Sequence, residues 1–423
     1  MKIRQVIGRE IFDSRGFPAV ECELILEESA NQIFSVRAAI PSGLSRGKHE
    51  AFELRDGQKR LFGRGVLKAV DNLQNVIGPA IIGQEPDVVQ MDIKMLELDN
   101  TENKSKLGAN AILAASIAIL KAQAIANRLE VYELIARLCE LSSVSIPIPM
   151  LNIISGGMHA PNNLDMQEFL IIPAGQTTFR SAFEDSLTVF YNLNDLLKEK
   201  GLYNCIGDEG GFAPALKNER EALDLILEAI KKSSGIEGTF VIGIDVAASR
   251  LYNQDKNNYT IHGKQYSQDA LIKLYSELIN NYPIVYIEDP FDQDDLETWK
   301  DFTKIFGEKI QITGDDLFTT NPEKILKGAK EKLANSAVIK PNQIGTITET
   351  LQAIIVAKEN GLDTIISHRS GETNDNIVVD LAMGTQSGQI KAGGPTRGER
   401  LSKYNRLLRI EDKLTMQVLN NES

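Results

Sequence analysis

Six short segments rich in β-branched residues decide the fold of this chain: FVIGID (240–245), IVYIED (284–289), IQITGD (310–315), SAVIK (336–340), TIISHR (364–369) and GQIK (388–391). Helical patterns separate them, and each segment reaches a polar or charged residue at its end. Those residues, at positions 245, 288, 315, 340, 368 and 391, are 43, 27, 25, 28 and 23 residues apart. This spacing suits a strand–helix–strand repeat and predicts a parallel αβ barrel of about 250 residues.

An open, doubly wound sheet also alternates strands with helices, so it remains an alternative at this stage. Dinucleotide-binding sheets of that kind carry a GxGxxG motif directly after a strand, and no strand in this sequence is followed by one. The barrel is therefore favoured. In a parallel barrel the carboxyl ends of the strands converge on one mouth, where active sites lie.

The first third of the chain has a different pattern. Residues 18–40 alternate apolar and polar side chains around a turn-like SANQ, which predicts a β-hairpin. Residues 65–141 are helical in pattern, and the proline-containing stretch 142–150 marks the passage into the barrel. We expect a small α+β domain over residues 1–137 and a catalytic αβ barrel over residues 138–423, an α/β fold overall.

Composition narrows the class of function. The 423 residues carry 46 lysines and arginines against 58 aspartates and glutamates, a net charge of −12 that disfavours nucleic acid as the main partner. Three scattered cysteines imply no disulfide framework. The first sixteen residues lack the apolar core of a secretory signal. The Ala-rich stretch 109–126 is broken by polar residues, so we expect a buried helix rather than a membrane span, and a cytoplasmic protein.

Three of the predicted strand ends supply carboxylates: Asp245, Glu288 and Asp315. Any one of these acids would usually form an ion pair or cap a helix. Three that converge on one mouth repel one another unless a cation lies between them. A few hard oxygen ligands, with room left for water and substrate, suit Mg²⁺ best.

The next three strand ends are cationic or polar. They supply Lys340, His368 with Arg369 and Ser370, and Lys391. A cationic half-circle that faces an acidic one suits a small anionic substrate, because arginine can bind a phosphate with two parallel hydrogen bonds. A lysine crowded by a metal ion and other cations has a lowered pKa and can remove a proton.

Two segments outside the repeat add candidate groups. Glu209 lies in the glycine-rich GDEGGFAP (207–214), and His159, Gln167 and Glu168 lie in 155–169. Adjacent acids in such a loop are most often solvated, and Glu209 becomes a candidate general acid only beside the barrel set. GLSRG (43–47) matches the GxSxG motif of serine hydrolases, but its polar surroundings favour a lid loop that contains Ser45. His262 is expected to be structural.

The chain resembles the enolase family over about residues 5–416. The resemblance rests on a series of blocks in order: DSRG (13–16), ELRD (53–56), GVLKAV (65–70), DNTENKSKLGANAIL (99–113), QEF (167–169), GDEGGFAP (207–214), DVAAS (245–249), IEDP (287–290), GDDLF (314–318), NQIGT (342–346), SHRSGET (367–373), GQIK (388–391) and KYNRLLRIED (403–412).

The resemblance implies a barrel that begins irregularly, with two strands and two helices before the regular units. It also implies the dehydration of 2-phosphoglycerate to phosphoenolpyruvate with two Mg²⁺ ions per site. Asp245, Glu288 and Asp315 would hold the first ion and Ser45 would help hold the second. Lys340 would be the base and Glu209 the acid, with Glu168 and Lys391 close to the reacting centre. The implied substrate contacts are His159, Gln167, His368, Arg369 and Ser370.

The main departures from the family pattern lie beside Ser45, at Leu44 and Arg46. They leave open the alternative of a diverged paralogue that acts on a related phosphonate or phosphorylated acid. Because members of the family also bind other macromolecules, a mainly non-catalytic binding protein on the same scaffold is a further alternative. The resemblance also implies a homodimer or octamer.

Overall fold

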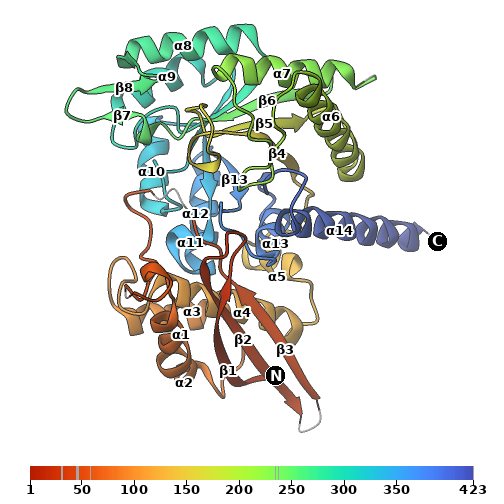
Figure 1. Ribbon diagram of the computed structural model, residues 1–423. Helices are drawn as coiled ribbons and strands as arrows, with labels where there is room; N and C mark the ends of the chain where they lie inside the picture. The colour runs from red at the N-terminus through yellow and green to blue at the C-terminus, as the bar shows by residue number, and fades with distance from the viewer. Residues whose placement is uncertain (30–31, 44–46, 58, 234, 237, 423) are drawn as a thin grey trace.

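The computed structural model describes residues 1–29, 32–43, 47–57, 59–233, 235–236 and 238–422, with side chains as far as residue 416 (Figure 1). Its N-terminal part begins with an antiparallel sheet of three strands, β1 (Lys2–Phe12), β2 (Pro18–Ser29) and β3 (Gln32–Ala39). The pairing of β2 with β3 confirms the predicted hairpin. The sequence analysis missed β1, because its buried positions Ile3 and Val6 are separated by exposed polar residues and give no strict alternation.

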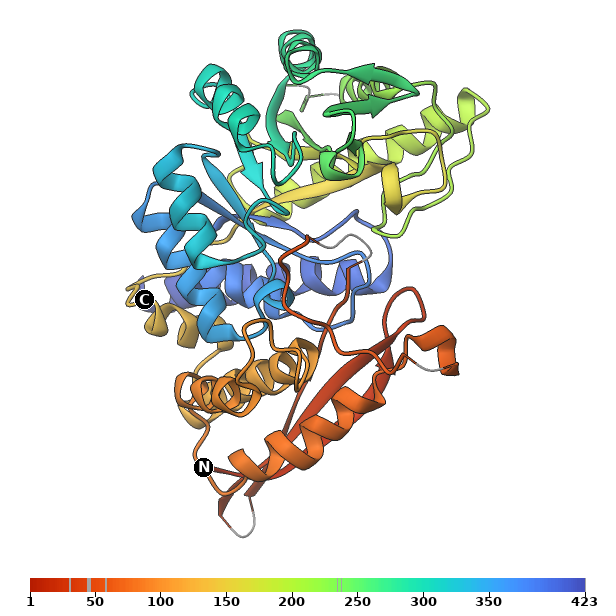
Figure 2. The same cartoon turned by 90° about the vertical axis from the view of Figure 1, so that its left-hand side faces the viewer.

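Helices cover one face of this sheet, as the helical pattern of residues 65–141 predicted (Figure 2). The central one, α4 (Ala109–Ala126), is long and apolar enough to cross a membrane, yet 78% of it is buried inside the protein. It is a core helix, as expected. The others are η1 (Arg60–Gly63), α1 (Leu67–Asn72), the π-helical turn η2 (Leu73–Ile77), α2 (Gly78–Ile81), α3 (Val88–Asp99) and α5 (Val131–Leu138).

The second part is a closed barrel, so the open-sheet alternative is wrong. Its strands are β4 (Ile148–Ser155), β5 (Glu168–Pro173), β6 (Phe240–Asp245), β10 (Ile284–Glu288), β11 (Gln311–Gly314), β12 (Ser336–Ile339), β13 (Asp363–Ser367) and β14 (Gly388–Lys391). Hydrogen bonds between β14 and β4 complete the circle. β5 runs antiparallel to both of its neighbours, so the barrel begins irregularly, as the family resemblance implied.

Helices surround the barrel and connect its strands (Figure 1). Two of them, α6 (Phe179–Glu199) and α7 (Glu219–Lys232), precede the regular units, and a small hairpin sheet of β7 (Tyr252–Asn253), β8 (Asn258–Ile261) and β9 (Lys264–Tyr266) follows β6. The other helices are η3 (Gly157–His159), η4 (Ala248–Arg250), α8 (Gln268–Asn281), α9 (Leu296–Phe306), α10 (Pro322–Glu331), α11 (Pro341–Ile344), α12 (Ile347–Glu359), α13 (Ile377–Gly384) and α14 (Gly398–Glu422).

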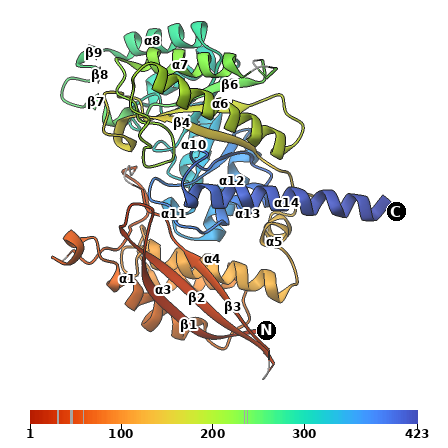
Figure 3. The same ribbon diagram turned by 45° about the vertical axis from the view of Figure 1, so that its right-hand side comes forward.

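The N-terminal part lies against the barrel on the side of α11, α12 and α13 (Figure 3). Ser42 forms a β-bridge with Gly371, and Asp92 on α3 accepts hydrogen bonds from Thr348 on α12. The segment after β3 therefore reaches the loop that follows β13. The boundary expected between residues 137 and 138 falls at the end of α5, and it stays a prediction.

Candidate active site

The predicted strand ends meet at one mouth of the barrel. A narrow cavity of about 10 Å³ lies there, lined almost entirely by polar and charged side chains. Asp245 and Lys391 come from β6 and β14, Lys340 follows β12, and three residues follow β13. The complete lining is His159, Gln167, Glu168, Glu209, Asp245, Lys340, Ser367, His368, Arg369, Ser370 and Lys391. Glu288 and Asp315 contact the two lysines from the adjacent strand ends.

Lys391 lies among three carboxylates. Its Nζ is 2.6 Å from Glu288 Oε2, 3.2 Å from Glu168 Oε2 and 3.3 Å from Asp245 Oδ2. Burial disfavours its charge, but these acids outweigh burial and raise the pKa of Lys391 well above its ordinary value. Burial, followed by the repulsion of Asp245, raises the pKa of Glu288 to about 7. The cluster is therefore short of positive charge.

Lys340 forms a buried ion pair with Asp315, whose other oxygen accepts a hydrogen bond of 2.8 Å from Gln343 Nε2. Burial alone would lower the pKa of Lys340, but the Asp315 carboxylate outweighs it and raises that pKa. The lowered pKa expected for a base at this position thus depends on a cation that takes over Asp315.

Glu168 and Glu209 form a pair of buried acids joined by His159, whose Nδ1 is 3.5 Å from a carboxylate oxygen of each. Glu209 also lies 3.3 Å from His368 Nε2 and from Asn152 Nδ2. Burial and the neighbouring Glu209 raise the pKa of Glu168 well above its usual range. Burial also opposes the ionisation of Glu209, but His159 and His368 outweigh burial and hold the pKa of Glu209 well below its usual range. In the substrate-free site the proton therefore belongs to Glu168.

Arg369 is held by the N-terminal part of the chain. Its guanidinium contacts both oxygens of Glu50 at 3.1 Å and Asn342 Oδ1 at 3.0 Å. Arg15 NH1 in turn donates to the hydroxyl of Ser370 at 3.4 Å. Arg369 and Ser370, two of the predicted substrate contacts, are thus oriented by residues from both parts of the chain.

Sequence reasoning did not single out Glu50, Gln343, Asn342 or Arg15 as parts of the site. Asn342 and Gln343 begin the NQIGT block two and three residues after Lys340, and Arg15 belongs to DSRG. Both blocks had been quoted for the family resemblance, so they could have pointed to these three residues. Glu50 lies in no such block, and only the fold brings it to Arg369.

Ser45, with its neighbours Leu44 and Arg46, lies outside the described residues. The flanking glycines do lie at the mouth. A Cβ on Gly43 would overlap with the Arg369 guanidinium, and one on Gly47 would be 2.6 Å from Thr319. Gly43 therefore lies against Arg369, a residue of the cavity lining, and Gly47 lies against Thr319 and Asp316.

The acid cluster fits a divalent cation. Glu288 Oε1 and Gln167 Oε1 are buried and have no hydrogen-bond donor within the described part of the chain. Both atoms are acceptors, which are the atoms that a hard cation needs. Asp289, Asp315 and Asp316 also place carboxylate oxygens within 4.8 Å of one another. Asp245, Glu288 and Asp315 thus form an acceptor-rich set beside these groups.

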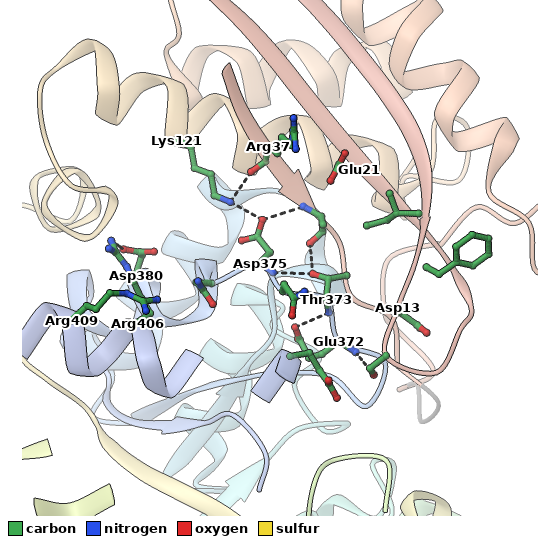
Figure 4. Close-up of a pocket in the computed structure, with 17 residues that line it drawn as sticks. Asp13, Glu21, Arg37, Lys121, Glu372, Thr373, Asp375, Asp380, Arg406 and Arg409 are labelled. Carbon is green, nitrogen blue, oxygen red and sulfur yellow. Dashed lines mark hydrogen bonds and ion pairs between the residues drawn. The ribbon is translucent and has the colours of Figure 1, made fainter. Parts of the chain in front are cut away.

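Two other clusters do not belong to this mouth. His262 Nε2 is 2.7 Å from Glu219, and its backbone N–H donates to Asp165, which supports the expected structural role. A cavity of about 710 Å³ lies between the N-terminal sheet and α14 (Figure 4). Its lining includes Lys121, which contacts Asp375 at 2.6 Å. The larger volume alone does not mark an active site, because none of the residues predicted at the barrel strand ends lines this cavity.

Comparisons with known proteins agree with this geometry. The family model described as the enolase C-terminal TIM barrel domain matches residues 143–421, and the enolase N-terminal domain model matches residues 3–135. The chain belongs to the enolase family. A protein named enolase from Natranaerobius thermophilus is 48% identical over 414 residues, which cover 97% of this chain and 95% of that protein. Membership of the enolase family excludes the serine-hydrolase interpretation of GLSRG, since the paired domains match across almost the whole chain.

Proposed function

We propose that Lys340 and Glu209 are the base and the acid with which this phosphopyruvate hydratase dehydrates 2-phosphoglycerate to phosphoenolpyruvate. The observation that carries the proposal is their convergence on one cavity from distant elements, the end of β12 and the loop 207–214. Lys340 Nζ takes the proton from C2 and leaves an enolate intermediate, whose electron pair then forms the C2–C3 double bond as the C3 hydroxyl leaves. Glu209 supplies a proton to that hydroxyl, which departs as water.

Glu209 must take up a proton before this step, because in the substrate-free site the pKa of Glu168 is raised whereas that of Glu209 is held well below its usual range. The substrate contacts are His159, Gln167, Glu168, Lys340, His368, Arg369, Ser370 and Lys391. Arg369, held in place by Glu50, binds the phosphate.

We infer two Mg²⁺ ions per site, the first held by Asp245, Glu288 and Asp315 and the second with help from Ser45. Held by these residues, Mg²⁺ would supply positive charge for the negative charge that develops on the substrate carboxylate, and Asp315 would then raise the pKa of Lys340 less. The buried oxygens Glu288 Oε1 and Gln167 Oε1, which accept no hydrogen bond in the described part of the chain, support this assignment.

The test is the ultraviolet absorbance of phosphoenolpyruvate formed from 2-phosphoglycerate over a Mg²⁺ titration, with EDTA as the metal-free control. The wild-type enzyme is expected to turn over only with metal. Lys340→Ala is expected to lose turnover and keep its circular dichroism spectrum, whereas Lys309→Ala, at an exposed lysine of the same domain, keeps full activity. Turnover by Lys340→Ala would contradict the assignment of the base.

Leu44 and Arg46, which motivated the alternative of a diverged paralogue, lie outside the described residues, so no observation of the structure favours that alternative. Very slow turnover of 2-phosphoglycerate by folded, Mg²⁺-binding protein would favour the paralogue that acts on a related acid. We further propose a cytoplasmic enzyme that forms a homodimer or octamer. A monomeric mass by light scattering would overturn the oligomer.

A further inference from the structure

Arg400, in the first turn of α14, joins two loops of the barrel mouth although it does not line the cavity. Its side chain has no exposed area. Its guanidinium donates to the backbone oxygens of Arg369 at 2.7 Å, Ser370 at 2.7 Å and Asp208 at 3.1 Å. One cation thus holds the loop that carries Glu209 against the loop that carries His368.

The fourth contact of this guanidinium is with a side chain. Arg400 NH1 lies 2.6 Å from Nδ1 of His368. A guanidinium has only N–H donors, so the imidazole nitrogen that faces it must be an acceptor. A neutral His368 then carries its proton on Nε2, which lies 3.3 Å from Glu209 Oε2.

We propose that Arg400 is a positioning residue that fixes His368 in the Nε2–H tautomer and thereby directs an N–H group at the carboxylate of Glu209. The inference rests on the proposed function for its catalytic consequence, but the tautomer itself is a property of the substrate-free protein.

The surroundings of His368 favour the neutral ring. Burial lowers its pKa to about 4; Glu209 and Glu372 oppose this shift, and Arg400 adds to it. An imidazolium would also place an N–H donor against the Arg400 donor. In the other neutral tautomer, Nδ1–H would face the guanidinium and the Nε2 lone pair would face the Glu209 carboxylate. In that tautomer the contact with the guanidinium and the contact with the carboxylate are both repulsive.

The consequence for the reaction concerns the direction of Glu209. With the Nε2–H bond in place, the Glu209 carboxylate has fixed donors in His368 and Asn152. Without Arg400 the ring can turn or change tautomer, and one of these donors is lost. We expect slower protonation of the leaving hydroxyl, which lowers kcat more than it changes KM.

The first test needs no variant and no substrate. The chain has four histidines, so ¹⁵N-labelled imidazole signals can be assigned by comparison with His368→Gln. At neutral pH we expect His368 to show a protonated Nε2 and an unprotonated Nδ1. A protonated Nδ1, whether in the other tautomer or in an imidazolium, overturns the proposal even if the enzyme dehydrates 2-phosphoglycerate.

The second test separates positioning from general stability. Lys403 is an equally buried cation one turn further along α14; it contacts Glu372 and Thr373 but not His368. Arg400→Met is expected to lower kcat about 10- to 100-fold and to change the His368 nitrogen signals. Lys403→Met is expected to leave those signals unchanged, whatever its effect on stability.

Arg400→Lys keeps one donor and is expected to recover part of the loss in kcat with the original tautomer. Unchanged His368 signals in folded Arg400→Met would overturn the proposal. Should Arg400→Met not fold, Arg400→Lys and the measurement on the wild-type protein still decide it. Inactive wild-type protein with the expected tautomer would contradict the proposed reaction alone.

Discussion

At the level of single residues, Asp289 connects the carboxylates of the barrel mouth. It is buried and adopts a left-handed backbone conformation, with φ of 42°. Its two oxygens accept the backbone N–H groups of Asp315 and Asp316, both at 2.9 Å. Its own backbone groups bond to Thr313 at 2.9 Å and Ala248 at 3.0 Å. Asp289, for which no role was predicted, therefore links the ends of β6, β10 and β11.

We expect Asp289→Asn to lower Mg²⁺ affinity about 10- to 100-fold, because an amide has one acceptor oxygen for two N–H groups and Asp315 loses its fixed direction. Isothermal titration with MgCl₂ measures the affinity without turnover. Asp292→Asn serves as the control, since Asp292 holds only its local turn through the N–H of Asp294. Equal affinities in the two variants would contradict this role.

Asp92 is the second informative residue. Its Oδ2 accepts two hydrogen bonds from Thr348, whereas Oδ1 is buried without a partner in the described part of the chain. Burial raises its pKa to about 6 from the ordinary 3.8. A raised pKa in the folded state means that the contribution of Asp92 to stability is greatest below about pH 4 and is lost as pH rises through 6, by about 3 kcal/mol in total.

Asp92→Asn removes this titration. We expect the free energy of unfolding of the variant, relative to wild type, to improve from about pH 4 to about pH 8. Urea unfolding curves at the two pH values measure the difference. A constant difference between the two proteins at both pH values would show that Asp92 is not titrating in the folded state.

At the level of elements, the loops at the mouth pack against each other through backbone. The segment after β14 bonds to the acid loop through Gly394 N–H and the backbone oxygen of Glu209 at 2.7 Å. A Cβ on Gly394 would overlap with the backbone of Gly210 and lie 2.6 Å from the backbone oxygen of Asn152. No flexible side chain is available to move aside, so the loop that carries Glu209 must shift.

Gly394→Ala is therefore expected to reduce kcat at least about 10-fold, through displacement of Glu209. Gly398→Ala is the matched control, because a Cβ at the start of α14 would meet no atom within 4 Å. That control is expected to retain activity and to be as stable as wild type or slightly more so. Steady-state kinetics and thermal unfolding of both variants check the prediction, and full activity of Gly394→Ala would refute it.

At the level of the whole molecule, the site depends on both parts of the chain and on the charge balance at the mouth. Glu50 of the N-terminal part holds Arg369 of the barrel, and Lys391 and Lys340 offset the converging acids. A bound cation adds the positive charge that the raised pKa of Glu288 shows to be lacking. Metal binding should therefore stabilise the entire fold rather than one loop.

Saturation with Mg²⁺ at about 100 times its dissociation constant is expected to stabilise the protein by about 2.7 kcal/mol. Thermal unfolding in MgCl₂ and in EDTA measures this effect as a rise in Tm. Glu288→Gln, which removes one predicted ligand, is expected to abolish most of the rise. An equal rise in Glu288→Gln would mean that Mg²⁺ stabilises the protein from another place.

The sequence by itself determined six of the eight barrel strands, all except β4 and β5, and their terminal residues. β-Branched runs and the spacing between them are local properties, and the carboxyl ends of barrel strands meet by geometry, so Asp245, Glu288, Lys340 and Lys391 could be assigned to one mouth. β1 was not predicted because its buried and exposed positions do not alternate strictly. No periodicity distinguishes the antiparallel β5 from the parallel strands of the barrel.

Only the tertiary structure decided which of these groups touch, and therefore which hold protons. These contacts join residues that are far apart in the sequence. Lys391 lies 103 positions or more from the acids that it contacts, Glu50 lies 319 positions from Arg369, and Arg400 lies 32 positions from His368. Sequence spacing cannot predict such pairs, because they depend on how the barrel closes and how the N-terminal part packs against it. The pKa directions of Glu168, Glu209 and Lys340 follow from those contacts and from burial, and neither exists until the chain is folded.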